Sequence, residues 1–140
     1  MKTYILDSNA LISFLTDRNL DQQAKIAKVF NDAADLKVKI LCPQNVLTEF
    51  VYVMQTVYQV NSSEIKTMIN DFMGLPGTQI FHDINMKLLL NYWPDCFPDF
   101  GDAIVAAVCK GKKGSFVFSF DRKFNAKLKK LGLSVVTFKK

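Results

Sequence analysis

The sequence has only one histidine, His82, and three cysteines that lie far apart, Cys42, Cys96 and Cys109. A single histidine excludes the HExxH site of zinc metalloproteases, and no serine or cysteine lies in a motif that pairs it with a histidine base. An odd number of cysteines without CxxC spacing argues against a disulfide framework and against a structural zinc site. The residue types left for site chemistry are therefore carboxylates and lysines.

Phosphate-binding glycine loops and long apolar runs are also missing. Neither GxGxxG nor GxxxxGK followed by Ser or Thr occurs, so neither dinucleotide binding nor P-loop nucleotide binding is indicated. The best candidate for a membrane segment, residues 103–109, is seven residues long, whereas a span needs roughly 18–20. Asp7 interrupts the first apolar run too early for a signal peptide. We therefore expect a cytoplasmic protein, and its 140 residues, 49% hydrophobic, suit one domain spanning residues 1–140.

Short apolar runs that favour strands alternate with longer segments that favour helices. The expected strands are residues 3–6, 38–41, 79–82, 115–120 and 133–138. The expected helices are residues 9–15, 20–36, 43–59, 61–72, 85–92, 99–110 and 121–131. This alternation predicts an α/β fold with a parallel sheet that helices cover on both faces. In such sheets, ligands bind beyond the carboxyl ends of the strands.

Two aspartates directly follow predicted strands, Asp7 after residues 3–6 and Asp121 after residues 115–120. Because the carboxyl ends of parallel strands meet at one edge of the sheet, the shared position of the two acids is a first indication of a site. Aspartate is also a common cap and turn residue, and capping remains an equal explanation for each of them.

Two further carboxylates lie on predicted helices. Glu49 falls just outside the apolar stripe of its helix, beside Val53, where a carboxylate is costly unless it is paired, binds a metal or reaches solvent. Asp102 lies in the first turn of a helix opened by Asp99, and the small apolar residues that follow predict that this helix packs in the interior. The alternative is structural, with Asp99 as an N-cap and Asp102 favoured by the helix dipole.

Together, these acids form an oxygen-only set of candidate ligands, which suits Mg²⁺ or Mn²⁺. Such carboxylate sites cleave phosphodiesters by activating a water and stabilising the leaving oxygen. Without Asp7, Glu49, Asp102 and Asp121, nine acidic residues remain against 18 basic ones, and ten of the basic residues lie in residues 110–140. A basic surface beside an acidic pocket is what cleavage of a polyanion requires, although a solvated lysine face is the alternative.

The chain resembles the PIN-domain nucleases, and its size is similar to that of the VapC-type toxin ribonucleases of prokaryotic toxin–antitoxin pairs. The match consists of residues 4–12 (YILDSNALI), Glu49, residues 99–107 (DFGDAIVAA) and residues 118–124 (FSFDRKF). Their order and spacing agree over residues 3–138. The resemblance implies a three-layer α/β/α sandwich with a central, mainly parallel sheet. It also implies an endoribonuclease that depends on Mg²⁺ or Mn²⁺ and leaves 5′-phosphate and 3′-hydroxyl ends.

The resemblance also implies roles for individual residues. The catalytic and metal-binding centre would consist of four acids, Asp7, Glu49, Asp102 and Asp121. Asn9 would orient a site carboxylate, Ser119 would support the position beside Asp121, and Asp99 would be a cap or a group behind the ligands. Separately from the resemblance, the concentration of positive charge in residues 110–140 gives the candidates for RNA contacts, namely Arg122, Lys123, Lys127, Lys129 and Lys130. The implied partners are an RNA substrate, a small antitoxin and a second copy of the chain, with no membrane.

Two other interpretations stay open. One is another acidic, Mg²⁺-dependent phosphoryl-transfer domain, but receiver domains need an acidic pair near the first strand and dehalogenase-like domains need DxD. The segment Asp7-Ser8-Asn9 supplies neither. The other is a catalytically silent PIN-like module that binds nucleic acid or protein, and the presence of all four acids argues against it. An assay for metal-dependent RNA cleavage would distinguish both from a ribonuclease.

Overall fold

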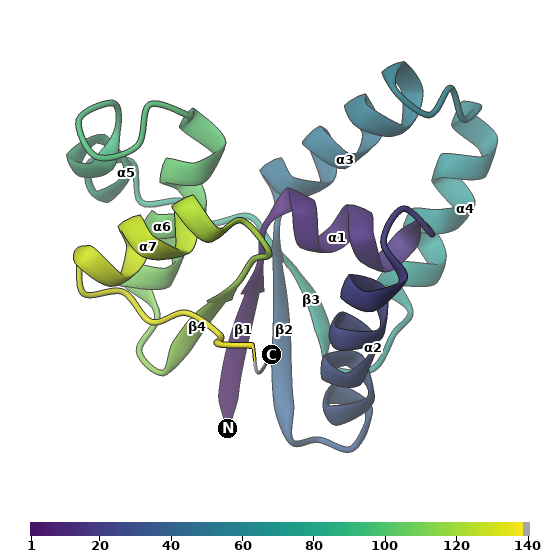
Figure 1. The fold of residues 1–140 in the computed structure, drawn as a ribbon, viewed down its shortest axis with the longest axis horizontal. Helices are drawn as coiled ribbons and strands as arrows, with labels where there is room; N and C mark the ends of the chain where they lie inside the picture. Colours follow the sequence, from purple (N-terminus) through teal and green to yellow (C-terminus); the bar gives the residue numbers. More distant parts are fainter. Residues whose placement is uncertain (139–140) are drawn as a thin grey trace.

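Four parallel strands lie side by side at the centre of the structure, a computed structural model that describes residues 1–138 (Figure 1). In the order in which they pair, the strands are β3 (Thr78–Phe81), β2 (Val38–Pro43), β1 (Lys2–Leu6) and β4 (Ser115–Phe118). Tyr4 of β1 pairs with Ile40 of β2 on one side and with Phe116 of β4 on the other. The strand β1 therefore lies inside the sheet, and its carboxyl end is next to that of β4.

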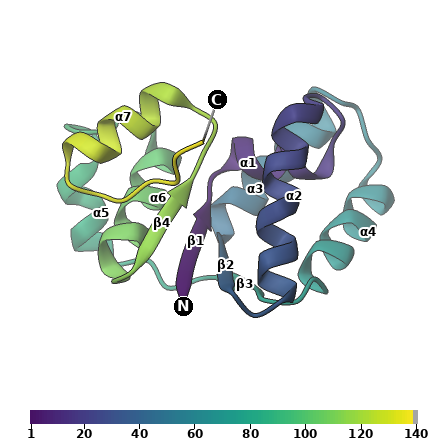
Figure 2. The same cartoon turned by 60° about the horizontal axis from the view of Figure 1, so that its bottom comes forward.

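Residues 1–138 contain seven helices, of which the first six connect the strands and the last follows β4. They are α1 (Ser8–Leu15), α2 (Leu20–Ala34), α3 (Gln44–Thr56), α4 (Ser62–Met73), α5 (Met86–Tyr92), α6 (Phe100–Gly111) and α7 (Arg122–Lys130). The first two connections lead from β1 to β2 and β3, and the third returns across the sheet to β4. Right-handed crossovers in opposite directions place their helices on opposite faces of the sheet. The predicted three-layer α/β/α sandwich with a parallel sheet is thereby confirmed (Figure 1, Figure 2).

Most of these helices begin at an Asp or Asn whose side chain accepts a backbone N–H of the first turn, which satisfies a donor that the helix itself leaves unpaired. The capping residues are Asp7 for α1, Asn19 for α2, Asn61 for α4, Asn85 for α5, Asp99 for α6 and Asp121 for α7. The helix α3 follows Pro43, which has no capping side chain. Three of the caps are candidate site residues, so the acids that begin helices also lie near the carboxyl edge of the sheet.

The helix α6 is the most deeply buried helix, because its residues 103–109 are small or medium-sized and apolar and all of them are buried. It packs against β1 and β4. This packing brings the first turn of α6, with Asp102, to the carboxyl edge of the sheet, as the sequence predicts. No helix within residues 1–138 is both long and apolar enough to cross a membrane.

The last predicted strand, residues 133–138, is largely absent. The segment forms one isolated parallel bridge, between Val135 and Val117 of β4. The Val117 N–H donates to the Ser134 carbonyl at 3.0 Å, and the Val136 N–H donates to the Val117 carbonyl at 2.9 Å. The next carbonyl on that edge of β4 belongs to Ser119, and it accepts a hydrogen bond from Asn125 Nδ2 at 2.9 Å. The pairing ends there because the following edge acceptor is already occupied by α7.

Candidate active site

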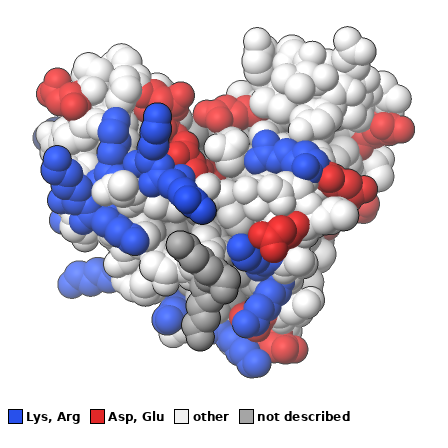
Figure 3. Space-filling model, viewed as in Figure 1, with Lys and Arg blue, Asp and Glu red and all other residues white. Residues whose placement is uncertain are grey.

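The four candidate acids line one pocket of about 240 Å³. Asp7 follows β1, Asp121 lies in the turn between β4 and α7, Glu49 comes from α3 and Asp102 from the first turn of α6. The pocket lies beyond the carboxyl ends of β1 and β4, where the strand order reverses, which is the usual ligand position in open parallel sheets. Figure 3 shows Asp and Glu side chains on both sides of the notch between the lobe of α5 to α7 and the lobe of α1 to α4.

Asp7 is buried, with 5% of its surface exposed, and uses both carboxylate oxygens. Its Oδ1 accepts the Ala10 N–H at 2.8 Å, which caps α1, and its Oδ2 accepts the hydroxyl of the buried Ser119. Burial raises the pKa of Asp7 to about 6, against the lowering effect of these two hydrogen bonds, and the charges of Asp121 and Glu49 raise it further. Asp7 is therefore both the N-cap of α1 and a carboxyl group with a raised pKa in the pocket.

Ser119 connects this acid to the turn after β4. While its hydroxyl donates to Asp7, its Oγ accepts the backbone N–H of Asp121 at 3.0 Å. The Asp121 Oδ1 in turn accepts the Phe124 N–H at 3.1 Å and caps α7. The contact of Ser119 beside Asp121 is as expected, and the direct contact with Asp7 is an addition that the sequence did not indicate.

Asp102 is half-buried and belongs to the first turn of α6. Its backbone N–H donates to Asp99 Oδ1 at 2.9 Å, so Asp99 is the N-cap of this helix. Burial raises the pKa of Asp102 to about 7, and the charges of Asp99, Asp7, Asp121 and Glu49 raise it further, in that order. A carboxyl at the start of a helix normally keeps a low pKa. At Asp102 the pKa is instead raised, chiefly by burial and then by the surrounding acids.

Glu49 is exposed, but a hydroxyl and a glycine define its position. Its Oε2 accepts the Ser8 hydroxyl at 2.5 Å. Its Oε1 lies so close to Gly101, in the first turn of α6, that a Cβ at position 101 would overlap it. Sequence reasoning passed over both contacts. The available signal was a glycine inside the first turn of a helix, where it costs stability unless the missing side chain has a use.

The remaining predicted site residues, Asn9 and the five basic candidates, are exposed. Asn9 lines the pocket and is exposed, and within residues 1–138 its side chain makes no hydrogen bond, so its role as an orienting group stays a prediction. All five basic candidates lie on α7 and are exposed. Arg122 and Lys129 line a separate groove, and Lys127 Nζ lies 6.0 Å from the centroid of the Phe97 ring. Lys123 and Lys130 line neither the pocket nor that groove.

The donor set of the pocket fits a hard divalent cation. Its ionisable groups are all carboxylates, with hydroxyl and amide oxygens beside them and no thiol or imidazole. Oxygen-only sets select Mg²⁺, Mn²⁺ or Ca²⁺. As the side chains stand in the described part of the chain, no three acidic, histidine or cysteine groups are close enough to hold an ion together. Burial is the main cause of the raised pKa values of Asp7 and Asp102, and the neighbouring carboxylate charges add to it. A bound cation would relieve the repulsion between those charges.

Comparison with known families settles the relationship of the chain. Residues 4–130 match the PIN domain. The chain belongs to the PIN-domain family. PIN domains are nucleases that generally use divalent metal ions, which agrees with the carboxylate pocket of this member. No curated protein matches the sequence of this PIN domain.

Three solved structures share its fold. PAE2754 from Pyrobaculum aerophilum is 17% identical, with a TM-score of 0.61 over 90% of this chain and 86% of that chain. The toxin VapC20 (Rv2549c) from Mycobacterium tuberculosis, which cleaves the sarcin–ricin loop, is 15% identical, with a TM-score of 0.65 over 88% and 93%. VapBC2 from Rickettsia felis, bound to a DNA fragment from its promoter, is 12% identical, with a TM-score of 0.63 over 96% and 97%. At these identities the likeness shows the fold alone.

The raised pKa values predict how stability depends on pH without metal. Between about pH 4 and pH 7 the folded protein binds more protons than the unfolded chain, because Asp7 and Asp102 titrate above the ordinary 3.8. The resulting loss of stability is absent at lower pH and complete above about pH 7. Asp7→Asn and Asp102→Asn remove the charge, and asparagine retains the capping oxygen of Asp7. In EDTA at pH 8 both variants should melt at or above the wild-type temperature, and the difference should shrink as the pH falls and fade near pH 4.

The stabilisation by added metal is the second quantity to measure for the wild type and the two variants. Mn²⁺ at a hundredfold excess over its dissociation constant should stabilise the wild type by about 2.7 kcal/mol and the two variants much less. Thermal melts with and without Mn²⁺ give both quantities. A drop of many degrees for both variants in EDTA at pH 8 would show that these aspartates act chiefly as helix caps.

Because Glu49 Oε1 lies where a Cβ at position 101 would be, a substitution of Gly101 should disturb the site and not the fold. Gly101→Ala should push the flexible end of Glu49 aside, while alanine favours the helix by about 1 kcal/mol over glycine. We expect an unchanged or higher metal-free melting temperature and a smaller Mn²⁺-induced shift. Gly111→Ala is the matched control, because Gly111 lies in the same helix as Gly101 and its Cβ would meet Leu88 Cδ2 of α5 at an ordinary contact distance of 4.0 Å. Equal Mn²⁺ responses of the two variants would mean that Glu49 does not need this position.

Proposed function

We propose that this PIN domain is an endoribonuclease that hydrolyses RNA phosphodiester bonds with the help of Mg²⁺ or Mn²⁺. The supporting observation is that four carboxylates, from segments far apart in the sequence, line one pocket where the strand order reverses. Family membership supports a nuclease and removes the alternative of a receiver-like or dehalogenase-like domain. A silent binding module is disfavoured because it would have no need to keep Asp7 and Asp102 at raised pKa values, a cost to the fold.

The proposed ligands are Asp7, Glu49, Asp102 and Asp121. A divalent ion held by these residues would supply a water of lowered pKa and would stabilise the charge that develops on the phosphate. The chain contributes orientation: Ser119 and the Ala10 N–H hold both oxygens of Asp7, and the Ser8 hydroxyl holds Glu49.

The pocket also limits which group can move a proton. Its ionisable side chains are all carboxylates, so a carboxylate is the group there that can take the proton from the attacking water. An attack by water in line with the bond to the ribose 3′ oxygen leaves 5′-phosphate and 3′-hydroxyl ends, which are the products we propose.

We further propose that the protein acts in the cytoplasm as the toxin of a toxin–antitoxin pair and forms a homodimer. The support is the shared fold with VapC20 and VapBC2. Large apolar side chains also remain exposed at the far end of α3, with 67% of Tyr52 and 68% of Val57 accessible. An exposed apolar patch of this kind favours a protein partner.

The nuclease proposal predicts metal-dependent cleavage. Purified protein with Mn²⁺ or Mg²⁺ should cut single-stranded or loop RNA, and excess EDTA should stop the reaction because the carboxylates alone cannot activate water. Asp102→Asn should reduce cleavage by several orders of magnitude while the protein stays folded. The measurement is product formation on a labelled RNA, with end-group analysis for the 5′-phosphate. Undiminished cleavage in EDTA would remove the metal from the mechanism.

The toxin proposal predicts an effect on a host cell. Induced expression of the wild type should arrest growth, and expression of Asp102→Asn should not, because the arrest comes from RNA cleavage. Size-exclusion chromatography with light scattering should give the mass of a dimer. A monodisperse monomer whose expression leaves growth unchanged would count against both the toxin role and the dimer.

A further inference from the structure

A second and larger groove, of about 530 Å³, lies next to the acidic pocket. Its walls are the first turns of α2, the helix α7 and residues 135–138. The rings of Phe120 and Phe138 line it and stack on each other, with centroids 5.1 Å apart and planes 23° apart. The turn between β4 and α7 separates the two spaces. Ser119 lines the groove while its hydroxyl contacts Asp7 in the pocket, so the two sites share one wall.

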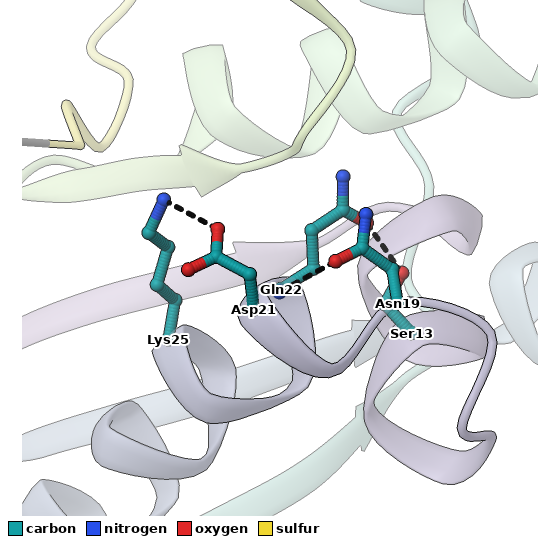
Figure 4. Close-up of polar contacts among 5 residues, drawn as sticks. All are labelled: Ser13, Asn19, Asp21, Gln22 and Lys25. Atoms are coloured by element: carbon teal, nitrogen blue, oxygen red, sulfur yellow. Dashed lines mark hydrogen bonds and ion pairs between the residues drawn. The ribbon is translucent and has the colours of Figure 1, made fainter. Parts of the chain in front are cut away.

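The α2 side of the groove presents hydrogen-bond donors. Asn19 Oδ1 accepts the Gln22 backbone N–H at 3.1 Å, and Gln22 Oε1 accepts the Ser13 hydroxyl at 2.7 Å. Both amide oxygens are therefore used within the protein, whereas the two amide nitrogens have no acceptor within residues 1–138. Figure 4 shows these two nitrogens pointing the same way. Beside them, Lys25 Nζ lies 3.0 Å from Asp21 Oδ2.

The α7 side of the groove presents cations. Arg122 and Lys129 both line it, and neither has an ion pair or a side-chain hydrogen bond in the described part of the chain. With Lys25, three cations face a single lining carboxylate, Asp21. A surface of cations and N–H donors attracts a chain rich in anionic acceptors. The phosphate backbone of a nucleic acid has that chemistry, because it repeats an anionic acceptor at every nucleotide.

We propose that this groove binds the RNA strand next to the nucleotide whose phosphate enters the acidic pocket. The inference rests on the proposed function and places its substrate on the protein. A strand with one phosphate among the carboxylates can pass over the shared turn at Ser119 and meet Arg122, Lys129 and the α2 donors. That continuity favours RNA over an acidic protein segment. Of the five RNA-contact candidates from the sequence, Arg122 and Lys129 line the groove, whereas Lys123, Lys127 and Lys130 lie outside it. The proposal adds Asn19, Gln22 and Lys25 as RNA contacts.

The test compares two double variants of the full chain with equal net charge. Lys25→Gln with Lys129→Gln removes one groove cation from α2 and one from α7. The control, Lys28→Gln with Lys130→Gln, removes one cation from each of the same helices outside the groove. Binding of a 5′-labelled single-stranded RNA is followed by fluorescence anisotropy over a salt series, in EDTA so that cleavage does not interfere. Melting temperatures confirm that both variants are folded.

We expect the groove variant to bind RNA at least about tenfold more weakly than the control, the loss that one charge-assisted contact represents. Its salt slope should fall by about 0.7 for each lost phosphate contact with a single strand. Gln22→Ala, which changes no charge, should weaken binding and leave the salt slope unchanged. These three results together would support the proposal that the groove binds the RNA strand.

Equal losses in the two double variants would overturn the inference, because they would show a response to net charge alone. Unchanged RNA binding combined with groove-dependent binding of poly-glutamate would overturn it in favour of an acidic protein partner. The failure of the proposed function gives a different result. If the wild type binds RNA through the groove but does not cleave it with Mn²⁺, the nuclease proposal is wrong and the proposal that the groove binds RNA is supported. If the wild type cleaves RNA normally and the two double variants bind RNA equally well, only the proposal that the groove binds RNA is wrong.

Discussion

The hydrogen bond from the Ser119 hydroxyl to the Asp7 carboxylate is the contact on which the rest of the site depends. It joins the residue that ends β1 to the turn that follows β4, and the backbone N–H of Asp7 also donates to the Phe118 carbonyl at 3.4 Å. The same Ser119 Oγ accepts the Asp121 N–H, so one buried hydroxyl sets the distance between two candidate ligands. Because Asp7 and Asp121 also begin α1 and α7, the directions of these helices and the geometry of the pocket are determined together.

This overlap explains why the sequence left two interpretations of these aspartates open. A carboxylate has two oxygens, and at Asp7 and Asp121 one of them caps a helix. From the sequence, capping and participation in a site are alternatives, whereas the geometry allows one residue to do both. The position of an acid after a buried strand predicted the location of each residue correctly. It could not separate the two roles, because cap and ligand need the same residue type at the same place.

Other features could not be predicted because they depend on packing between distant segments. The α7 residues Arg122 and Lys129 are seven apart and so share a helix face, which was visible in the sequence. The α2 residues opposite them, Gln22 and Lys25, come from about a hundred positions earlier, and no local pattern connects them to α7. The same holds for Gly101, since the group that a Cβ there would overlap is Glu49 Oε1, which comes from the distant helix α3. The expected strand at residues 133–138 was wrong for most of its length for a similar reason, since Asn125 takes the edge acceptor that it would need.

The acidic pocket and the basic groove carry opposite charges, and a phosphodiester substrate would meet both. A phosphate entering a pocket of four carboxylates meets repulsion, since two unit charges about 5 Å apart interact by roughly 3 kcal/mol at an effective dielectric near 20. The groove cations cannot remove that repulsion for the bond to be cut, because they lie on the other side of the turn at Ser119. In the proposed complex they would hold the neighbouring phosphates, for which no metal is needed. Under this proposal, different groups would bind the strand and neutralise the charge of the phosphate to be cut. The short turn from Ser119 to Arg122 separates the acidic pocket from the basic groove and keeps the two surfaces adjacent.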